Sequence, residues 1–218
     1  MIEVHGLTVT YGRTLALHEM NLQIRPGVTG LFGQNGAGKS TLLRVLAGLR
    51  RPSSGYVTID GEVVDVRDET FRRFIAYSGH EIGLYRHLTV TENLQLFARM
   101  YGVSPSRIDE VLEGIGLADR AGSRVGQLSA GLARRASVAR ALLHEPRLLL
   151  LDEPYANLDD EASDKISTML RAWSGGPGYA IVATHGAKRV KSFADGAIIL
   201  KRGSVVSYRA RIDAEVES

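Results

Sequence analysis

A short run of glycines around one lysine is the clearest chemical feature of the sequence: GQNGAGKS at residues 33–40. Glycines at this density weaken regular structure, so the bare backbone must serve another purpose. Successive backbone N–H groups can surround an anion when no side chains obstruct them, and a following helix adds its positive end. The spacing matches G-x-x-x-x-G-K-[ST], in which Lys39 reaches the β- and γ-phosphates and the Ser40 hydroxyl holds Mg²⁺. This segment therefore predicts a nucleotide-binding loop rather than a simple glycine-rich turn. The expected nucleotide contacts in the loop are Gly33, Asn35, Gly36, Ala37, Gly38, Lys39, Ser40 and Thr41.

Two adjacent carboxylates follow a second apolar run, LLLL at residues 148–151. A continuous apolar strand is typical of a sheet covered on both faces, and ligands of parallel sheets bind beyond the carboxyl ends of the strands. Asp152 is placed to hold Mg²⁺ through water. Glu153 has no obvious ion partner and can accept a proton from an attacking water. In a chain that also carries a phosphate loop, the pair indicates hydrolysis rather than two solvated charges that end a strand.

Strand and helix patterns alternate at both ends of the chain and position these motifs, with a mostly helical block between them at about residues 86–143. This order predicts an α/β fold with a parallel sheet. Strands are expected at residues 2–11, 15–24, 28–32, 74–77, 148–151, 179–184, 197–200 and 204–208, with a hairpin at 56–64. Helices are expected from residue 89 onward and at residues 41–49, 105–115, 130–143, 159–173 and 187–192.

The composition narrows the class of protein. The chain has 218 residues, of which 44% are hydrophobic and 23% charged, as in a globular domain. No apolar run approaches the roughly 20 residues that cross a bilayer, and no secretion leader follows Met1, so a cytosolic location is expected. The absence of cysteine excludes disulfides and thiolate metal sites. The net charge is only +3 and the arginines are dispersed, which argues against direct nucleic-acid binding.

The segment LSAGLARR at residues 128–135 resembles the LSGGQ signature of ATP-binding-cassette (ABC) ATPases. Ser129 can cap the following helix, and Gly131 leaves its N-terminus open to a phosphate. The phosphate loop, the signature and LLLLDEP occur in the family's order, so the resemblance covers nearly the whole chain. In this family the signature faces the γ-phosphate of ATP bound to the opposite protomer. The resemblance thus implies ATP as the nucleotide and a dimer, either of two copies or of this chain and a related cassette.

Other positions also match elements of the family. Tyr11 resembles the aromatic residue that stacks on adenine, residues 156–159 resemble the D-loop at the dimer interface, and His185 resembles the switch histidine that bonds the γ-phosphate. Separate permease subunits would span the membrane and hold the chain at its cytoplasmic face. Residues 81–91, which include Tyr85, are the expected docking segment. The resemblance implies catalytic roles for Lys39, Glu153 and His185, and Mg²⁺ contacts from Ser40, Asp152 and His80.

The resemblance also implies the domain organisation. The expected fold is an ABC-type P-loop NTPase, with a RecA-like parallel-sheet core, an N-terminal antiparallel β subdomain and an inserted α-helical subdomain. The single domain covers residues 1–218. Within it, residues 1–85 and 144–208 form the core with the β subdomain, residues 86–143 form the helical subdomain, and residues 209–218 form a tail.

Two positions depart from the family pattern. His80, in YSGH, stands where the Q-loop usually has glutamine; a neutral imidazole can still accept a hydrogen bond or approach a metal, but it titrates near neutrality. Leu132 replaces the glutamine of the signature. The SGH triplet, with LSAG and DEPYANLD, is most similar to the haem-exporter subunits of cytochrome c maturation.

Three alternatives to haem export remain open. The chain could serve a drug or peptide exporter, act on nucleic acid or ribosomes as a soluble ABC ATPase, or bind ATP as a regulatory module without hydrolysing it. A single cassette without long insertions argues against the second. Intact Lys39, Asp152 and Glu153 argue against the third.

Overall fold

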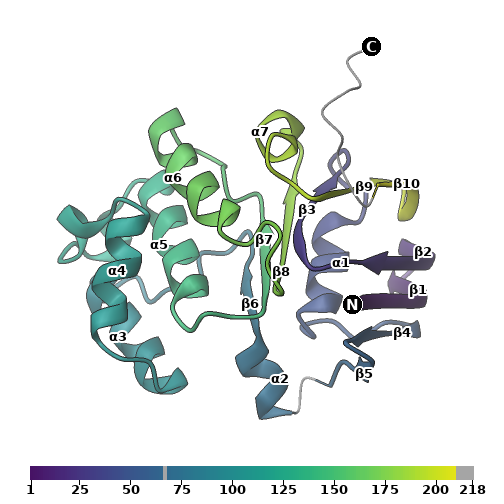
Figure 1. Cartoon of the computed structure of the whole chain (residues 1–218), viewed down its shortest axis with the longest axis horizontal. Helices are drawn as coiled ribbons and strands as arrows, with labels where there is room; N and C mark the ends of the chain where they lie inside the picture. Colours follow the sequence, from purple (N-terminus) through teal and green to yellow (C-terminus); the bar gives the residue numbers. More distant parts are fainter. Residues whose placement is uncertain (66–67, 210–218) are drawn as a thin grey trace.

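Two β-sheets organise the computed structural model of this chain, which describes residues 1–65 and 68–209 (Figure 1). In the larger sheet all strands but one run parallel, and the exception pairs antiparallel at an edge. The smaller sheet is antiparallel. Both sheets confirm the predicted fold class. The larger sheet has the order β10 (Ser204–Arg209), β9 (Gly196–Lys201), β3 (Gly27–Phe32), β8 (Tyr179–Thr184), β7 (Leu148–Asp152), β6 (Ile75–Ser78). The smaller sheet has the order β2 (Thr14–Ile24), β1 (Ile2–Tyr11), β4 (Ser54–Ile59), β5 (Glu62–Val63).

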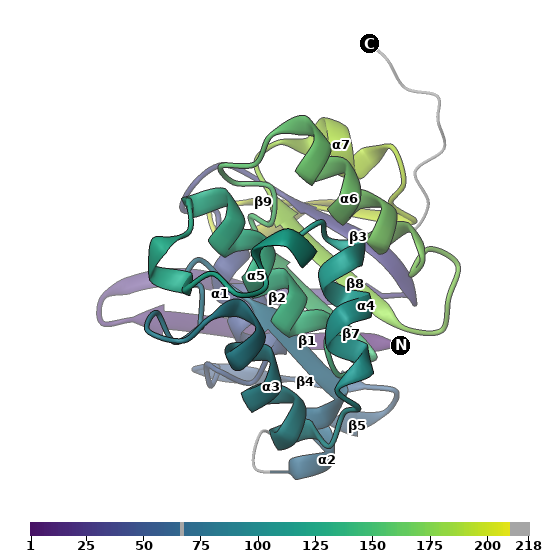
Figure 2. The same ribbon diagram turned by 90° about the vertical axis from the view of Figure 1, so that its left-hand side faces the viewer.

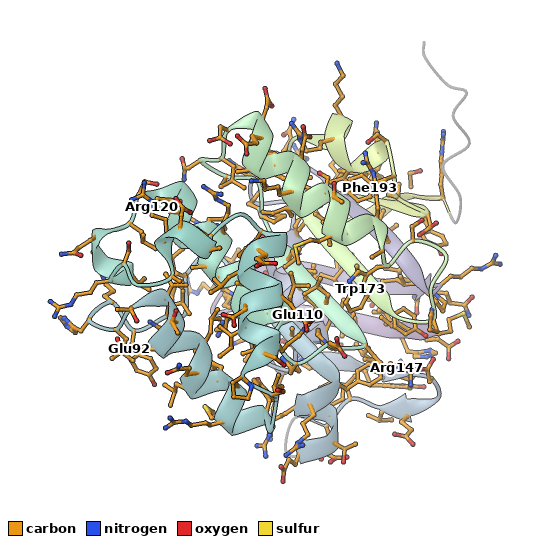
Figure 3. All side chains as sticks on the ribbon, turned by 60° about the vertical axis from the view of Figure 1, so that its left-hand side comes forward. Glu92, Glu110, Arg120, Arg147, Trp173 and Phe193 are labelled. Atoms are coloured by element: carbon orange, nitrogen blue, oxygen red, sulfur yellow. The ribbon has the colours of Figure 1, made fainter. Side chains whose placement is uncertain are left out.

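Helices cover both faces of the larger sheet. Helix α1 (Lys39–Leu46) lies between the sheets and contacts β7, β8 and β2. The opposite face carries α3 (Val90–Tyr101), α4 (Ser106–Gly114), α5 (Ala130–Leu142) and α6 (Asp160–Arg171) (Figure 2). Charged side chains such as Glu92, Glu110 and Arg120 project from this helical layer (Figure 3). The short helices are α2 (Glu69–Phe74) and α7 (Ala187–Lys191), with 3₁₀ turns η1 (Ala118–Arg120) and η2 (Val125–Gln127).

The continuous apolar run of β7 is explained by two separate cores. Leu148 and Leu150 join the core that β7 shares with α1 and the smaller sheet. Leu149 and Leu151 join the core formed with the helical layer. Because alternate residues of a strand point to opposite faces, a strand buried on both faces must be apolar at every position. The apolar run stops at Leu151, and β7 ends at the next residue, Asp152.

The structure corrects several predicted boundaries. The strand expected at residues 74–77 begins at Ile75, because Phe74 ends α2, a helix that the sequence analysis did not predict. Asp68 starts this helix by accepting a hydrogen bond from the Thr70 N–H at 2.8 Å. Helix α1 ends at Leu46, earlier than expected, and Gly48 then takes a left-handed conformation. In the described part of the chain, no helix combines the length and apolar character needed to cross a membrane.

Candidate functional site

Close backbone packing explains the glycines of the predicted phosphate loop. A Cβ atom at Gly33 would lie 2.5 Å from the Leu200 carbonyl oxygen, and one at Gly38 would lie 2.9 Å from the Ala16 carbonyl oxygen. Gly36 and Gly38 also adopt left-handed conformations, with φ of 78° and 103°. The bare backbone that the sequence analysis assigned to anion binding is therefore also required by the β2 and β9–β10 segments that press against the loop.

Lys39 and the start of α1 give the loop its positive character. Gly38 precedes α1 and has no side chain that could cap the helix. The N–H groups of the first turn therefore remain free to donate hydrogen bonds to an anion. Lys39 is only 6% exposed, and its ammonium donates to the carbonyl oxygens of Gly33 at 2.7 Å and Gln34 at 3.2 Å. These bonds hold the cation over the loop. The loop thus offers amides and one fixed cation to a polyphosphate, a donor set that fits ATP.

Glu153 lies in a cluster of donors that the sequence analysis missed. Its carboxylate accepts hydrogen bonds from the Thr184 hydroxyl at 3.0 Å and the His185 backbone N–H at 2.9 Å. The Nδ1 atom of His185 lies 3.0 Å from the same carboxylate. Glu153 reaches this position through a left-handed backbone, φ 51°, and its own N–H donates to Ala183. The prediction that Glu153 lacks a partner was therefore wrong, because β7 and β8 are sequence-distant neighbours in the sheet.

Asp152 ends β7 at the same sheet edge as the phosphate loop. In the parallel register Asp152 pairs with Ala183, and Phe32, the last residue of β3, pairs with Thr184. Asp152 is 4% exposed, which keeps its carboxylate close to the sheet end. A buried carboxylate and the Ser40 hydroxyl at the start of α1 are oxygen donors of the type that Mg²⁺ prefers.

Arg134, another residue without a predicted role, connects the signature helix α5 to the backbone at the Q-loop position. It is buried, and its guanidinium donates to the carbonyl oxygens of Gly79 and His80. Burial lowers the pKa of Arg134, while the nearby carboxylates of Asp152 and Glu153 oppose that shift. Arg134 thus fixes the backbone at His80 and counters the acidic charge. The Arg134–Arg135 pair in the sequence gave no sign that one of the two is buried.

His80 itself is exposed and lines a groove of about 470 Å³. The groove runs between α1, α2 and β6 on one side and α3 and α5 on the other, with Tyr77 and Arg140 in its walls. Burial raises the pKa of the Tyr77 hydroxyl and lowers that of the Arg140 guanidinium. The Q-loop position therefore faces both the Arg134 anchor and an open groove.

The signature segment has a second steric constraint. Ser129 caps α5 as predicted, accepting the Leu132 N–H at 3.3 Å, and its side chain is exposed. A Cβ atom at Gly131 would lie 2.4 Å from the Asn157 carbonyl oxygen. Gly131 is thus needed where the predicted D-loop passes across the start of α5. Asp159 then caps α6 by accepting the Ala162 N–H at 2.7 Å.

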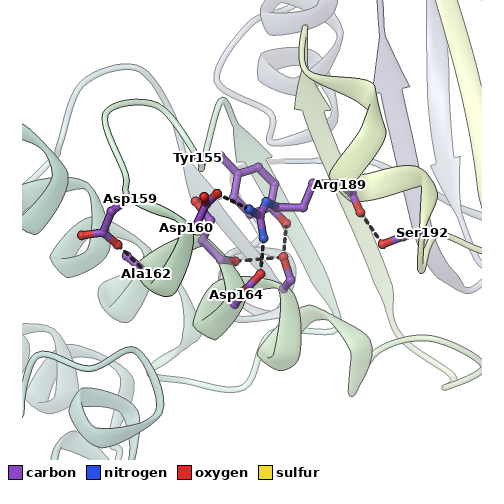
Figure 4. Close-up of polar contacts among 9 residues, drawn as sticks. Tyr155, Asp159, Asp160, Ala162, Asp164, Arg189 and Ser192 are labelled. Carbon is purple, nitrogen blue, oxygen red and sulfur yellow. Dashed lines mark hydrogen bonds and ion pairs between the residues drawn. The ribbon is translucent and has the colours of Figure 1, made fainter.

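Arg189, on α7, links this helix to α6 (Figure 4). Helix α6 follows Glu153 in the chain, and α7 follows His185. The Arg189 guanidinium bonds Asp160 at 2.8 Å and also Asp164, both on α6. Tyr155, two residues after Glu153, packs under this guanidinium. Tyr155, Asp164 and Arg189 line a groove of about 990 Å³ together with the Glu153–His185 pair.

Tyr11 lies at the end of β1 and is 39% exposed. One face of its ring is covered by the Arg50 guanidinium, whose carbon lies 4.4 Å from the ring centroid. The hairpin that Tyr11 begins also contacts the phosphate loop, since Leu17 and Ala16 lie against Gly38. An aromatic platform and a phosphate loop are therefore joined through one hairpin.

Comparisons with known proteins agree with this geometry. Residues 17–156 match the family model described as ABC transporter. The ABC transporter ATP-binding protein NatA of Bacillus subtilis (strain 168) is 34% identical over 209 residues, which cover 93% of this chain and 85% of NatA. The Nod factor export ATP-binding protein I of Rhizobium sp. (strain N33) is 36% identical over 207 residues, covering 93% of this chain and 68% of that protein.

A solved structure extends the likeness to the whole fold. The dimeric structure of MJ0796, a bacterial ABC transporter cassette, superposes with a TM-score of 0.88 at 29% identity, covering 99% of this chain and all of that one. The same cassette in a post-hydrolysis state bound to ADP and Pi gives a TM-score of 0.87. These proteins are not named for haem, so the haem-exporter resemblance stays a prediction. The family match, the relatives and the site geometry together show that the chain belongs to the ABC transporter family as an ATP-binding, ATP-hydrolysing subunit.

Proposed function

We propose that the chain hydrolyses ATP with Mg²⁺ at a site completed by a second cassette, and thereby drives export through separate membrane subunits. The observation that supports this most strongly is the cluster of Glu153, Thr184 and His185 at the sheet edge that carries the phosphate loop. A carboxylate held by three donors beside a polyphosphate loop suits activation of water. Each residue is given the role that its sequence motif predicts.

The phosphate loop binds and orients the triphosphate. The loop amides and Lys39 contact the phosphates, and the Tyr11 ring stacks on adenine. Ser40, Asp152 and His80 would hold Mg²⁺. When bound, Mg²⁺ would supply positive charge that neutralises the phosphates. Binding and orientation thus come from one hairpin, one loop and the ends of adjacent strands.

Glu153 accepts the proton of the attacking water. The Thr184 hydroxyl and the His185 N–H hold its carboxylate in one orientation. Its remaining lone pairs therefore face a single position for the attacking water. The Nδ1 atom of His185 faces Glu153, which leaves Nε2 for a γ-phosphate oxygen. Both ring nitrogens donate only in the imidazolium form, so this double contact requires a protonated His185. His185 and Lys39 then stabilise charge that develops on the transferred phosphoryl group.

A second cassette seals the site by presenting its signature. Ser129 and Gly131 of that cassette, at the open end of α5, contact the γ-phosphate and exclude water other than the nucleophile. Ser129 is exposed in the single chain, as such a contact requires. The dimeric MJ0796 cassette supports the proposal by analogy. A homodimer and a pair with a related cassette both satisfy it.

Residues 81–91, together with the groove beside His80, form the proposed docking surface for the permease. Asn93 is fully buried and holds this segment, accepting from the Tyr85 N–H at 2.7 Å and donating to the Tyr85 carbonyl oxygen at 3.0 Å. The Tyr85 side chain remains 59% exposed. A rigid backbone with an exposed aromatic residue suits an interface. Docking there would place the chain peripherally on the cytoplasmic face of the membrane.

Haem is the proposed cargo, on the strength of SGH at residues 78–80 together with LSAG and DEPYANLD. In cells that carry Lys39→Ala in place of the native chain, c-type cytochromes detected by haem staining should disappear while b-type haemoproteins remain. Pull-down of the intact membrane complex should recover polytopic partners. If the Lys39→Ala cells keep normal c-type cytochromes but become sensitive to a drug or peptide, that compound rather than haem would be the exported cargo. Recovery of ribosomes without membrane partners would favour the soluble class.

Replacing His80 with glutamine should make ATPase activity less sensitive to acid. An imidazole side chain can gain a proton and lose its acceptor, whereas a glutamine amide cannot, so native activity should depend more on pH than that of His80→Gln. Glutamine keeps an acceptor and does not titrate near neutrality. The measurement is the pH–rate profile of His80→Gln beside that of His87→Gln, an exposed histidine of the docking segment. Profiles of His80→Gln and native protein that superpose would remove the pH-sensing role.

A further inference from the structure

The Tyr11 ring is backed by a side chain that no motif predicts. Arg50 follows α1, and its guanidinium carbon lies 4.4 Å from the centroid of the Tyr11 ring. The same guanidinium donates through Nη2 to the Thr10 carbonyl oxygen at 2.7 Å. The hydrogen bond to the backbone beside Tyr11 prevents the cation from moving freely away from the ring. The guanidinium therefore occupies one ring face in a fixed position.

The segment that carries Arg50 also fixes the strand end. The Thr10 N–H donates to the Ser53 hydroxyl at 3.1 Å, and the two hydroxyl oxygens lie 2.8 Å apart. The Ser53 N–H donates to the Thr8 carbonyl oxygen at 2.8 Å. Residues 50–53 thus bind the last residues of β1 at several points. Movement of the Tyr11 backbone is restricted together with its ring.

This clamp connects Tyr11 to the helix that starts in the phosphate loop. The Arg50 N–H donates to the Arg44 carbonyl oxygen at 3.1 Å, and Arg44 lies on α1, whose first residue is Lys39. A platform joined in this way to the phosphate site holds a base and a polyphosphate at a constant separation. Preorganisation of this kind increases affinity by removing the entropy cost of ordering the ring on binding.

We infer that Arg50 is a positioning residue for nucleotide recognition: it holds the Tyr11 ring by a cation–π contact so that only the opposite face accepts the adenine. The inference rests on the proposed stacking role of Tyr11. Arg50 acts through that ring and not on the phosphates. Its loss should weaken the base-dependent part of binding and leave the phosphate-dependent part unchanged.

The test compares ADP, which carries the base and cannot be turned over, with pyrophosphate, which lacks it. Isothermal titration of Arg50→Met should show an increase in the Kd for ADP of about three- to fivefold, the size of one partly exposed cation–π contact. The Kd for pyrophosphate should not change. Steady-state assays should show a raised KM for ATP with native kcat. Arg50→Lys should restore part of the affinity because an ammonium can also lie over the ring.

Matched controls separate the possible failures. Arg51→Met removes the exposed neighbouring arginine and should bind both ligands normally. Tyr11→Ala should weaken ADP binding more than Arg50→Met and leave pyrophosphate binding intact; native ADP affinity in Tyr11→Ala would refute the stacking role itself. Weakened ADP binding in Tyr11→Ala with native affinity in Arg50→Met would overturn only the inference about Arg50. Equal weakening of ADP and pyrophosphate in Arg50→Met would also overturn it, since Arg50 would then act on the phosphates or on the fold.

Discussion

Glu153→Gln should lower ATP turnover by about 10²- to 10⁴-fold, the contribution expected of a positioned general base. Glutamine has nearly the same shape: its carbonyl oxygen can still accept from the His185 N–H, and its amide N–H can donate to the Thr184 hydroxyl oxygen, so the local geometry should survive. It cannot take the proton of the attacking water. ATP should therefore bind and remain intact, and the variant should accumulate as an ATP-bound dimer. Phosphate release at saturating ATP and size-exclusion chromatography with and without ATP measure the two effects.

The matched control is Glu113→Gln, a substitution at an exposed glutamate on α4. It should turn over ATP at the native rate and show no additional dimer. Native turnover in Glu153→Gln would remove Glu153 from the reaction and favour the regulatory binding module. Loss of turnover without an ATP-dependent dimer would agree with Glu153 as the general base. It would contradict an ATP site completed by a second cassette.

His185→Ala should lower kcat by about 10²-fold, as is typical when one stabilising donor to a developing charge is removed. The Glu153 carboxylate keeps the Thr184 hydroxyl and the backbone N–H at position 185, so it should stay in place. Lys39 and the loop amides are untouched, and the KM for ATP should therefore stay close to the native value. Initial rates across a range of ATP concentrations separate kcat from KM.

The control for this substitution is His18→Ala, at an exposed histidine on β2. It should show native values of both kcat and KM. A large rise in KM with unchanged kcat in His185→Ala would place the imidazole in ground-state binding. It would contradict the proposed stabilisation of the transferred phosphoryl group.

Local patterns in the sequence were enough to predict the parts of the site that lie on one segment. The phosphate loop and the Ser129 cap each depend on neighbours within a few residues, and both conformations are present. The apolar run before Asp152 also predicted a buried central strand. Such features follow from backbone conformation and from which faces are buried, so they can be read without knowing the strand order.

Features that join distant segments could not be predicted in this way. Glu153 meets Thr184 and His185 only because β7 and β8 are adjacent in the sheet. Gly131 must be small because the Asn157 backbone crosses it, and Arg50 covers Tyr11 although the two are far apart in the sequence. Arg134 and Arg189 are further cases, since one is buried against the backbone of Gly79 and His80 and the other bridges two helices. Only the tertiary arrangement distinguishes them from ordinary surface arginines.

Phosphate release by the purified chain, compared with that of Lys39→Ala at saturating ATP and Mg²⁺, most directly tests ATP hydrolysis at the phosphate loop. Lys39 supplies the only side-chain cation of the loop, and its ammonium lies 2.7 Å from the Gly33 carbonyl oxygen. Native protein should release phosphate, while Lys39→Ala should fall to the buffer rate and lose nucleotide affinity; Lys201→Ala, at an exposed lysine of β9, should remain native. Phosphate release that is absent from the native chain, or that persists undiminished without Lys39, would contradict ATP hydrolysis at this loop.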